Sequence, residues 1–132
     1  MASILRVNTL TDASSNNSVA TSTVFNGTAK AWANLNGSTF GLRDNFNVGS
    51  ATDNGTGDYT VNFSNNMNDA NYASPTCSDA TNFSQIGSVA TRVKASANIQ
   101  LYAAVVVGVP GSSARTLRDL EDVNVAILGD LA

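Results

Sequence analysis

Histidine is absent from the sequence, and cysteine occurs once among its 132 residues. Without an imidazole, neither a Ser-His-Asp nor a Cys-His catalytic arrangement can form, and the common zinc sites built on histidine are excluded. The lone Cys77 cannot close a disulfide within the chain. It has no histidine to activate it, so we interpret it as a small buried apolar residue rather than a nucleophile. The fold must therefore be held by its core or by assembly.

Charge and aromatic rings are also scarce. Charged residues make up 13% of the chain, against about a quarter in an average domain, and aromatic residues make up 7%. The net charge is −3, and the seven basic residues are dispersed. The closest basic pairs, Arg92 with Lys94 and Arg115 with Arg118, are interpreted as solvated positions. This pattern argues against a nucleic-acid partner, which needs a basic stripe. The surface must consist mainly of Asn, Ser and Thr, as suits a β-rich protein.

No apolar run is long enough for a membrane helix. The longest, Leu101–Pro110, is about half the length that such a helix needs, so we expect no membrane insertion. The first residues, M-A-S-I-L-R-V, lack the charged segment and long apolar stretch of a signal peptide. Synthesis in the cytoplasm is therefore expected.

The acidic residues form no recognisable catalytic or metal-binding motif. Candidates for a two-carboxylate hydrolase are Asp44, Asp53, Asp58 and Asp69. Each of them lies beside Asn or Gly, as turn residues do. The D-N-G-T-G-D run at Asp53–Asp58 has oxygens for calcium but does not match the spacing of an EF-hand loop with its distant glutamate. We therefore predict that the protein is not an enzyme and has no metal and no cofactor.

The clearest local signal is Arg43–Ser64, where two alternating segments flank a cluster of turn residues. This pattern predicts a β-hairpin in which each arm has one buried face. The predicted buried faces are formed by Phe46, Val48 and Ser50 in the first arm and by Tyr59, Val61 and Phe63 in the second. The glycines and Asn/Asp side chains between the arms favour a turn. The turn residues are Asp53, Asn54, Gly55, Thr56, Gly57 and Asp58.

Similar alternation predicts strands at Thr28–Asn36, Ile86–Ala97, Ile99–Val109 and Val123–Leu128. One more strand is expected around Tyr72, although Pro75 restricts that segment to a sheet edge or a loop. In the first of these strands one face is formed by Ala29, Ala31, Ala33 and Leu35. Such small residues allow the close approach of a second sheet or of a neighbouring subunit. The predicted fold class is all-β, an antiparallel β-sandwich of short strands with an extended N-terminal assembly segment.

Two features leave open whether a neighbouring subunit completes the packing. Trp32 lies on the face opposite the alanines, where it is either a stacking platform for a sugar or a core or intersubunit anchor; the anchor is favoured. Ala103–Val107 is apolar on both faces. Its second face is therefore covered either by this domain or by another subunit.

Residues 1–27 are expected to form an assembly or anchoring segment, and residues 28–132 the β-sandwich domain. The first apolar residues are spaced to fit a helix turn as well as a strand, and Thr11–Thr23, rich in Asn, Ser and Thr, predicts an extended linker or loop. A segment this short needs partner chains for stability. Towards the other end, Arg115–Asp122 predicts a helical turn or a loop with its charges facing water.

Several of these segments together resemble a known module. A-K-A-W-A-N-L-N-G at Ala29–Gly37 is followed by L-R-D-N-F-N-V, T-D-N-G-T-G-D-Y-T-V-N-F and M-N-D-A-N-Y-A, over residues 29–73. This order resembles a module of the distal parts of tail fibres and other virion proteins of bacteriophages, including marine phages and cyanophages. Ile4–Ser18 and Asp122–Gly129 resemble its flanking segments more weakly. Members usually have W-V-N-F-N-G where this chain has the smaller Ala33 and Leu35.

The resemblance implies a homotrimeric virion protein made in the host cytoplasm, of the tail-fibre or fibre-tip type, with a role in host attachment. Its other partners would be virion proteins and, through the turn at Asp53–Asp58, a host cell-surface glycan. The alternative is a capsid decoration or cement protein that stabilises the head without binding a receptor, which the short chain favours. Candidate contacts between subunits are Ile4, Leu5, Val7, Ala31, Trp32, Val105, Val106 and Val107.

Overall fold

The computed structural model describes residues 4, 6–78, 85–107 and 115–132, except for the side chains of residues 85, 86 and 107. Over this part of the chain the fold is all-β with antiparallel sheets, as predicted, and includes one short helix. The elements are β1 (Thr9–Thr11), β2 (Ser18–Ala20), α1 (Thr21–Gly27), β3 (Ala31–Asn36), β4 (Gly41–Phe46), β5 (Val48–Gly55), β6 (Asp58–Phe63), β7 (Thr76–Ser78), β8 (Gln85–Lys94), β9 (Asn98–Val107), β10 (Arg115–Leu117) and β11 (Val123–Ile127).

One sheet has four strands in the order β4-β3-β11-β7, with every neighbouring pair antiparallel. Its central pair is held in register by Ala33 opposite Val125 and Trp32 opposite Ala126. Alternate residues of β3 and β11 are buried, because side chains of a strand point to opposite faces in turn. The buried residues are Ala31, Ala33, Leu35, Val123, Val125 and Ile127.

The second sheet has five strands, β5, β6, β8, β9 and β10. β9 is its centre: β8 pairs along one edge of β9, while β6 pairs with Asn98–Tyr102 and β10 with Ala104–Val106. A strand has two edges, so β6 and β10 follow one another along the edge that β8 leaves free. Two backbone bonds join them at Ala103, whose N–H donates to Gly57 and whose carbonyl accepts from Arg118.

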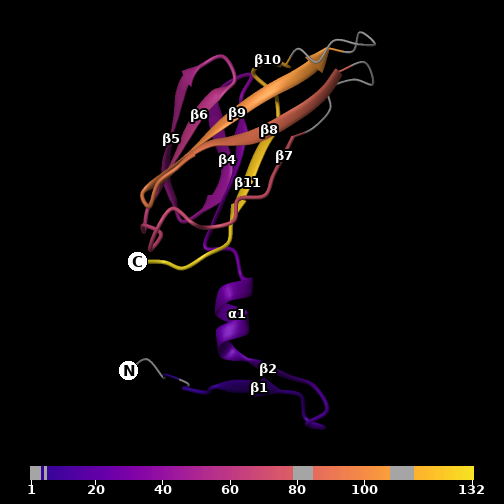
Figure 1. Cartoon of the computed structure of the whole chain (residues 1–132), viewed down its shortest axis with the longest axis vertical. Helices are drawn as coiled ribbons and strands as arrows, with labels where there is room; N and C mark the ends of the chain where they lie inside the picture. Colours follow the sequence, from indigo (N-terminus) through magenta and orange to yellow (C-terminus); the bar gives the residue numbers. More distant parts are fainter. Residues whose placement is uncertain (1–3, 5, 79–84, 108–114) are drawn as a thin grey trace.

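The two sheets contribute to a single hydrophobic core in a sandwich-like arrangement. From the five-stranded sheet the fully buried residues include Tyr59, Val61, Ile99 and Leu101, which face the buried residues of β3 and β11. Figure 1 shows the strands of the two sheets side by side with the helix below them. The small residues of β3 thus allow a second sheet of the same chain to approach, which is one of the two outcomes expected for them.

The predicted hairpin is present, but its first strand begins at Val48, later than predicted. β5 and β6 form the hairpin, whereas the preceding residues form β4 in the other sheet. The chain changes sheets at Asn47, whose φ of 55° is accessible to asparagine and whose side chain bonds to Lys30 and Asn65. Phe46 therefore lies on the four-stranded sheet and is 53% exposed, while Val48 is buried.

A bulge explains the second error in that arm. Val48 pairs with Phe63 and Ser50 with Asn62, so the register shifts by one residue between them. A shift of one residue moves every following side chain to the other face. Ser50 is exposed instead of sharing the buried face of Val48. The strand also continues further than predicted, to Gly55, which leaves a shorter turn before Asp58.

Other predictions also need correction. No strand forms around Tyr72: the residue is buried in a loop, next to an isolated bridge between Ala73 and Leu128. Cys77 is exposed, not buried, because it pairs with Asn124 and shares that residue's face. Arg115–Asp122 contains the short strand β10 followed by a loop, where a helical turn or a loop alone was expected. The strands predicted at the positions of β3, β8, β9 and β11 are confirmed.

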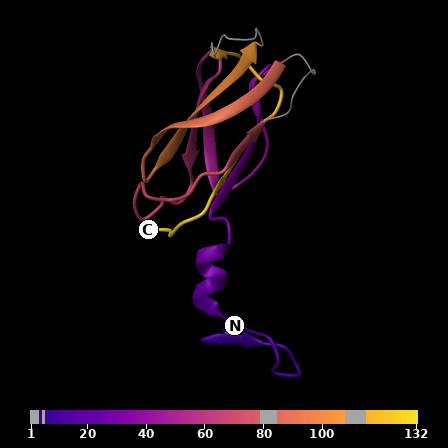
Figure 2. The same cartoon turned by 45° about the vertical axis from the view of Figure 1, so that its right-hand side comes forward.

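The N-terminal segment is structured, in contrast to the expected linker. β1 and β2 form a two-stranded hairpin, and α1 follows directly. Asp12 organises the turn: its carboxylate accepts bonds from the Asn16 N–H and the Ser14 and Asn17 side chains. The hydrogen bond from the Asn17 side chain contributes most to lowering the pKa of Asp12. Figures 1 and 2 show α1 extending from the end of the β-domain, with the hairpin at its far end. We call the segment formed by residue 4 and residues 6–27 the arm.

Candidate interaction surfaces

Exposed large apolar side chains gather in two regions of the described chain. Six of them are on the arm: Ile4, Val7, Leu10, Val19, Val24 and Phe25. Two more, Trp32 and Phe46, are paired across β3 and β4 on the outer face of the four-stranded sheet. The rest, Val93, Leu117 and Leu131, lie on separate elements. Grouped exposed apolar residues mark interaction sites more reliably than scattered ones do.

The arm holds its shape through local bonds. Leu10 and Val19 are cross-strand partners in the β1–β2 hairpin. Thr21 joins hairpin to helix, since its N–H and its hydroxyl both donate to the carbonyl of Asn8. At the other end of α1, the Lys30 ammonium donates to the carbonyls of Phe25 and Thr28. No residue of α1, β1 or β2 is buried.

Such an arm lacks the packing that normally stabilises these elements. Isolated helices shorter than about 12 residues are marginal in water, and α1 has 7. A lone two-stranded hairpin is also marginal. A hollow of about 580 Å³ between hairpin and helix, lined in part by Val7, Leu10 and Phe25, is not filled by the chain's own side chains. The arm therefore has the properties of a segment that another molecule covers.

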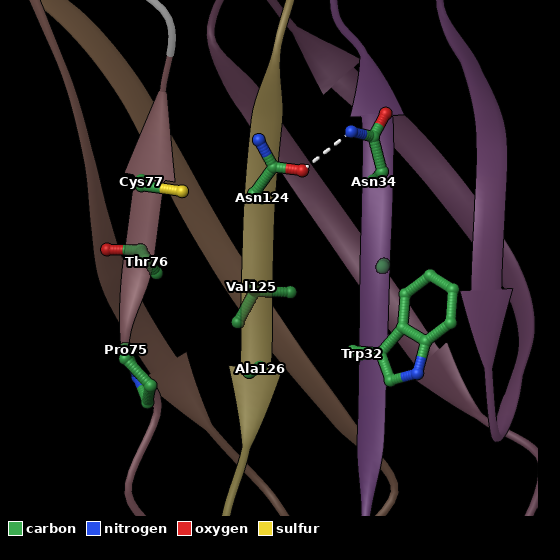
Figure 3. A pocket seen from close by; sticks show the side chains of 9 residues that line it. Trp32, Asn34, Pro75, Thr76, Cys77, Asn124, Val125 and Ala126 are labelled. Atoms are coloured by element: carbon green, nitrogen blue, oxygen red, sulfur yellow. Dashed lines mark hydrogen bonds between the residues drawn. The ribbon is translucent and has the colours of Figure 1, made fainter. Parts of the chain in front are cut away.

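A groove of about 470 Å³ lies on the outer face of the four-stranded sheet. Figure 3 shows Trp32 on β3 on one side of β11, and Cys77 on β7 with Pro75 just before it on the other side. Between them β11 presents Ala126, whose small side chain leaves the middle of the face hollow. None of the residues that line the groove is charged. Its shape and lining suit an uncharged, largely apolar occupant.

One end of the groove carries an amide pair. The Asn34 Nδ2 atom donates to the Asn124 Oδ1 atom over 2.7 Å, as Figure 3 shows. The Asn34 Oδ1 atom is buried and has no hydrogen-bond partner among the described residues. Buried polar atoms are nearly always paired, so this acceptor is an exception among the described residues.

The predicted intersubunit residues differ in their exposure to solvent. Ile4 and Val7 are exposed on the arm, and Trp32 is 36% exposed beside the groove. Ala31 and Val105 are buried and face the chain's own core. Val106 lies on the opposite face of β9 and is partly exposed. Leu5 and the side chain of Val107 lie outside the described residues.

The predicted binding loop lies at the β5–β6 turn, at the end of the domain opposite α1 (Figure 1). Its acids are used internally. The Asp53 carboxylate accepts the Gly55 N–H at 2.9 Å. The Asp58 carboxylate accepts bonds from Asn54 and Gln100 and pairs with Arg92 at 3.2 Å. The loop is thus a well-ordered exposed tip, and what remains for a ligand is neutral surface.

A partly buried contact that the sequence did not predict fixes this tip to the domain. Asp119 accepts bonds of 2.7 Å from both the Gly57 N–H and the Tyr59 hydroxyl. Burial and the bond to Asp119 raise the pKa of Tyr59 well above its ordinary value. Gly57 has a φ of 65°, and a Cβ there would lie 2.3 Å from the Ala103 carbonyl oxygen. Only the long-range pairing of β6 with β9 brings these groups together, so local sequence gives no signal of them.

The remaining acids have structural contacts. Asp44 lies on the outer face of the four-stranded sheet, where it is paired with Asn34 and accepts the Asn45 N–H. The Asn71 N–H and side chain bond to Asp69 and lower the pKa of that carboxyl. Among the described residues, no group of three or more His, Cys, Asp or Glu side chains is placed to hold a metal ion.

Comparison with family models, with curated proteins and with solved structures finds no match to this chain. In the part of the chain that the structure describes, no helix has the length and apolar character to cross a membrane.

Proposed function

We propose that this chain is a structural protein of a bacteriophage virion, of the tail-fibre or fibre-tip type, that assembles as a homotrimer through its arm. The observation that carries the proposal is the arm itself: it has six exposed large apolar side chains, four of them on elements too short to be stable alone. An enzyme or a monomeric binding module has no need of such a projection. The sequence resemblance to phage fibre modules supplies the class of assembly.

The two ends of the molecule expose different kinds of side chain, which supports a different role for each end. The arm has exposed large apolar side chains, while the β5–β6 turn at the opposite end exposes neutral polar groups such as those of Asn54 and Thr56. Amide and hydroxyl groups hydrogen-bond readily to sugar hydroxyls. In this proposal the arm faces the other virion proteins and the β5–β6 turn faces the host surface.

Cryo-electron microscopy of the intact particle tests the proposed position. Three-fold density on the tail, in few copies and with the β5–β6 turn outermost, is the expected result. Density spread in hundreds of copies over the head lattice would instead make this a decoration protein and would end the attachment proposal. Light scattering of the purified full chain tests the trimer separately, with a mass of three times 13.6 kDa expected.

A further inference from the structure

We infer that the arm of one copy binds in the groove of a second copy, so that each subunit covers its neighbour's four-stranded sheet. This inference rests on the proposed homotrimer and adds to it the contact that closes the ring. The arm and the outer face of the four-stranded sheet are the two places where exposed apolar side chains gather in the described chain. The arm projects from the domain and the outer face of the sheet contains the groove, so the two are complementary in shape.

The two surfaces are also compatible in charge. The residues lining the groove carry no charge, and residues 4–27 contain two charged residues, Arg6 and Asp12. Asp12 is engaged in the β1–β2 turn, whereas Arg6 forms no ion pair within the described residues. Asp44 lies beside the groove on the same outer face and likewise has no ion-pair partner there. An arm in the groove thus brings a free cation to a face with a free acid.

The arm cannot easily reach the groove of its own subunit. It leaves the domain at Lys30, whose N–H donates to Ile127 at 2.7 Å and whose carbonyl accepts from Asn47 at 3.0 Å. From that fixed base α1 extends away from both sheets, as Figures 1 and 2 show. Exchange between copies keeps these bonds, and in a ring of three every arm fills one groove and every groove receives one arm.

The arm also supplies hydrogen-bond donors. β1 and β2 pair only with each other among the described strands, so both outer edges of the hairpin present unpaired backbone groups. The side-chain amides of Asn34 and Asn124 line one end of the groove and can pair with such an edge. A neutral occupant with backbone N–H groups therefore satisfies the groove better than a purely aliphatic one.

Cysteine chemistry can test this arrangement, because Cys77 is the single cysteine and lines the groove. The variant Phe25→Cys places a thiol on the exposed face of α1. Under a mild thiol oxidant, which takes up two electrons and two protons per disulfide, the assembled variant should form covalent dimers and trimers on a non-reducing gel. The matched control is Asn54→Cys, at the opposite end of the domain, which should remain uncrosslinked like the unmodified chain.

A second measurement retains the wild-type Phe25. Cys77 in the assembled wild-type chain should react slowly with a maleimide, and Val24→Ser should raise that rate about tenfold as the groove opens more often. A trimer in which Phe25→Cys does not crosslink and Cys77 reacts at the same rate in both proteins would overturn the inference while leaving the trimer intact. Protection of Cys77 by an added neutral oligosaccharide, with no effect of Val24→Ser, would also overturn it. A monomeric mass would instead refute the proposed assembly.

Discussion

The arm and the β-domain contain the same kinds of apolar side chain, but these side chains are exposed in the arm and buried in the β-domain. Leu10 and Val19 alternate along β1 and β2 as Val61 and Leu101 do along β6 and β9. In the β-domain a second sheet covers the alternating residues and they are buried. In the arm no other described part of the chain covers them, and they are exposed. Burial is thus decided by what lies opposite a strand and not by the strand's own pattern.

This difference separates stability from assembly. Residues that face the core should determine whether the domain folds, because they lose their contacts within the same chain when it unfolds. Residues of the arm should determine whether copies associate. The following changes test this division, from the largest expected effect to the smallest.

Truncation of a core leucine should have the largest effect on folding. Leu101→Ala removes a side chain that is 0% exposed, and such changes cost about 2–5 kcal/mol of unfolding free energy. The matched change in the arm, Leu10→Ala, should alter the free energy of unfolding of the β-domain by less than about 0.5 kcal/mol. Urea denaturation followed by circular dichroism measures the first quantity, and light scattering measures the association that Leu10→Ala should weaken. Equal effects of the two changes on urea unfolding would contradict the division.

The tip of the β-domain provides the second comparison. Gly57→Ala forces a left-handed backbone on alanine and brings its Cβ against the Ala103 carbonyl, so we expect a loss of at least about 1–3 kcal/mol. Gly41→Ala is the control, because nothing lies within 4 Å of a Cβ there; its change should stay below about 1 kcal/mol. Thermal unfolding of both variants measures the difference. Equal melting temperatures would show that the contact between Gly57 and β9 is absent in solution.

High pH should destabilise the β-domain through its buried tyrosines. Burial raises the pKa of Tyr72 from 10.0 to about 12, and its hydroxyl donates to the carbonyls of Ala95 and Asn98. Because the unfolded chain loses this proton first, the stabilisation is complete below pH 10 and declines as the pH rises towards 12. Tyr72→Phe should make the decline shallower, with Tyr59 responsible for what remains. An unchanged slope between wild type and Tyr72→Phe in urea titrations at pH 9 to 11.5 would contradict this.

The smallest effect is expected from the charges that the arm and groove bring together. Arg6→Glu and Asp44→Lys should each weaken association about two- to fivefold, the range of an exposed ion pair, and the double variant should recover most of the loss. The dissociation constant from sedimentation at low salt measures each step. Additive losses in the double variant would place Arg6 and Asp44 apart in the assembly.

Much of the β-domain could be predicted from local alternation. β3, β8, β9 and β11 lie where the period of two placed them, and β5 and β6 form the predicted hairpin with a turn rich in Gly and Asn. The candidate site was predicted only in part. Trp32 and the first apolar residues were singled out, but the groove was not, because Cys77, Asn124 and Trp32 come from three strands far apart in the sequence.

What the sequence determined by itself was the positions of β3, β6, β8, β9 and β11, the buried faces of β3, β6 and β11, and the absence of histidine-based chemistry, since each follows from local geometry or from composition. Tertiary structure decided where the chain changes sheets at Asn47, which strands β9 joins, and that Phe46 and Cys77 face outward. It also left the apolar side chains of the arm exposed among the described residues. These outcomes depend on contacts between residues that are distant in the sequence. An alternating pattern predicts that one face of a strand is buried, but only the folded chain shows which element covers that face.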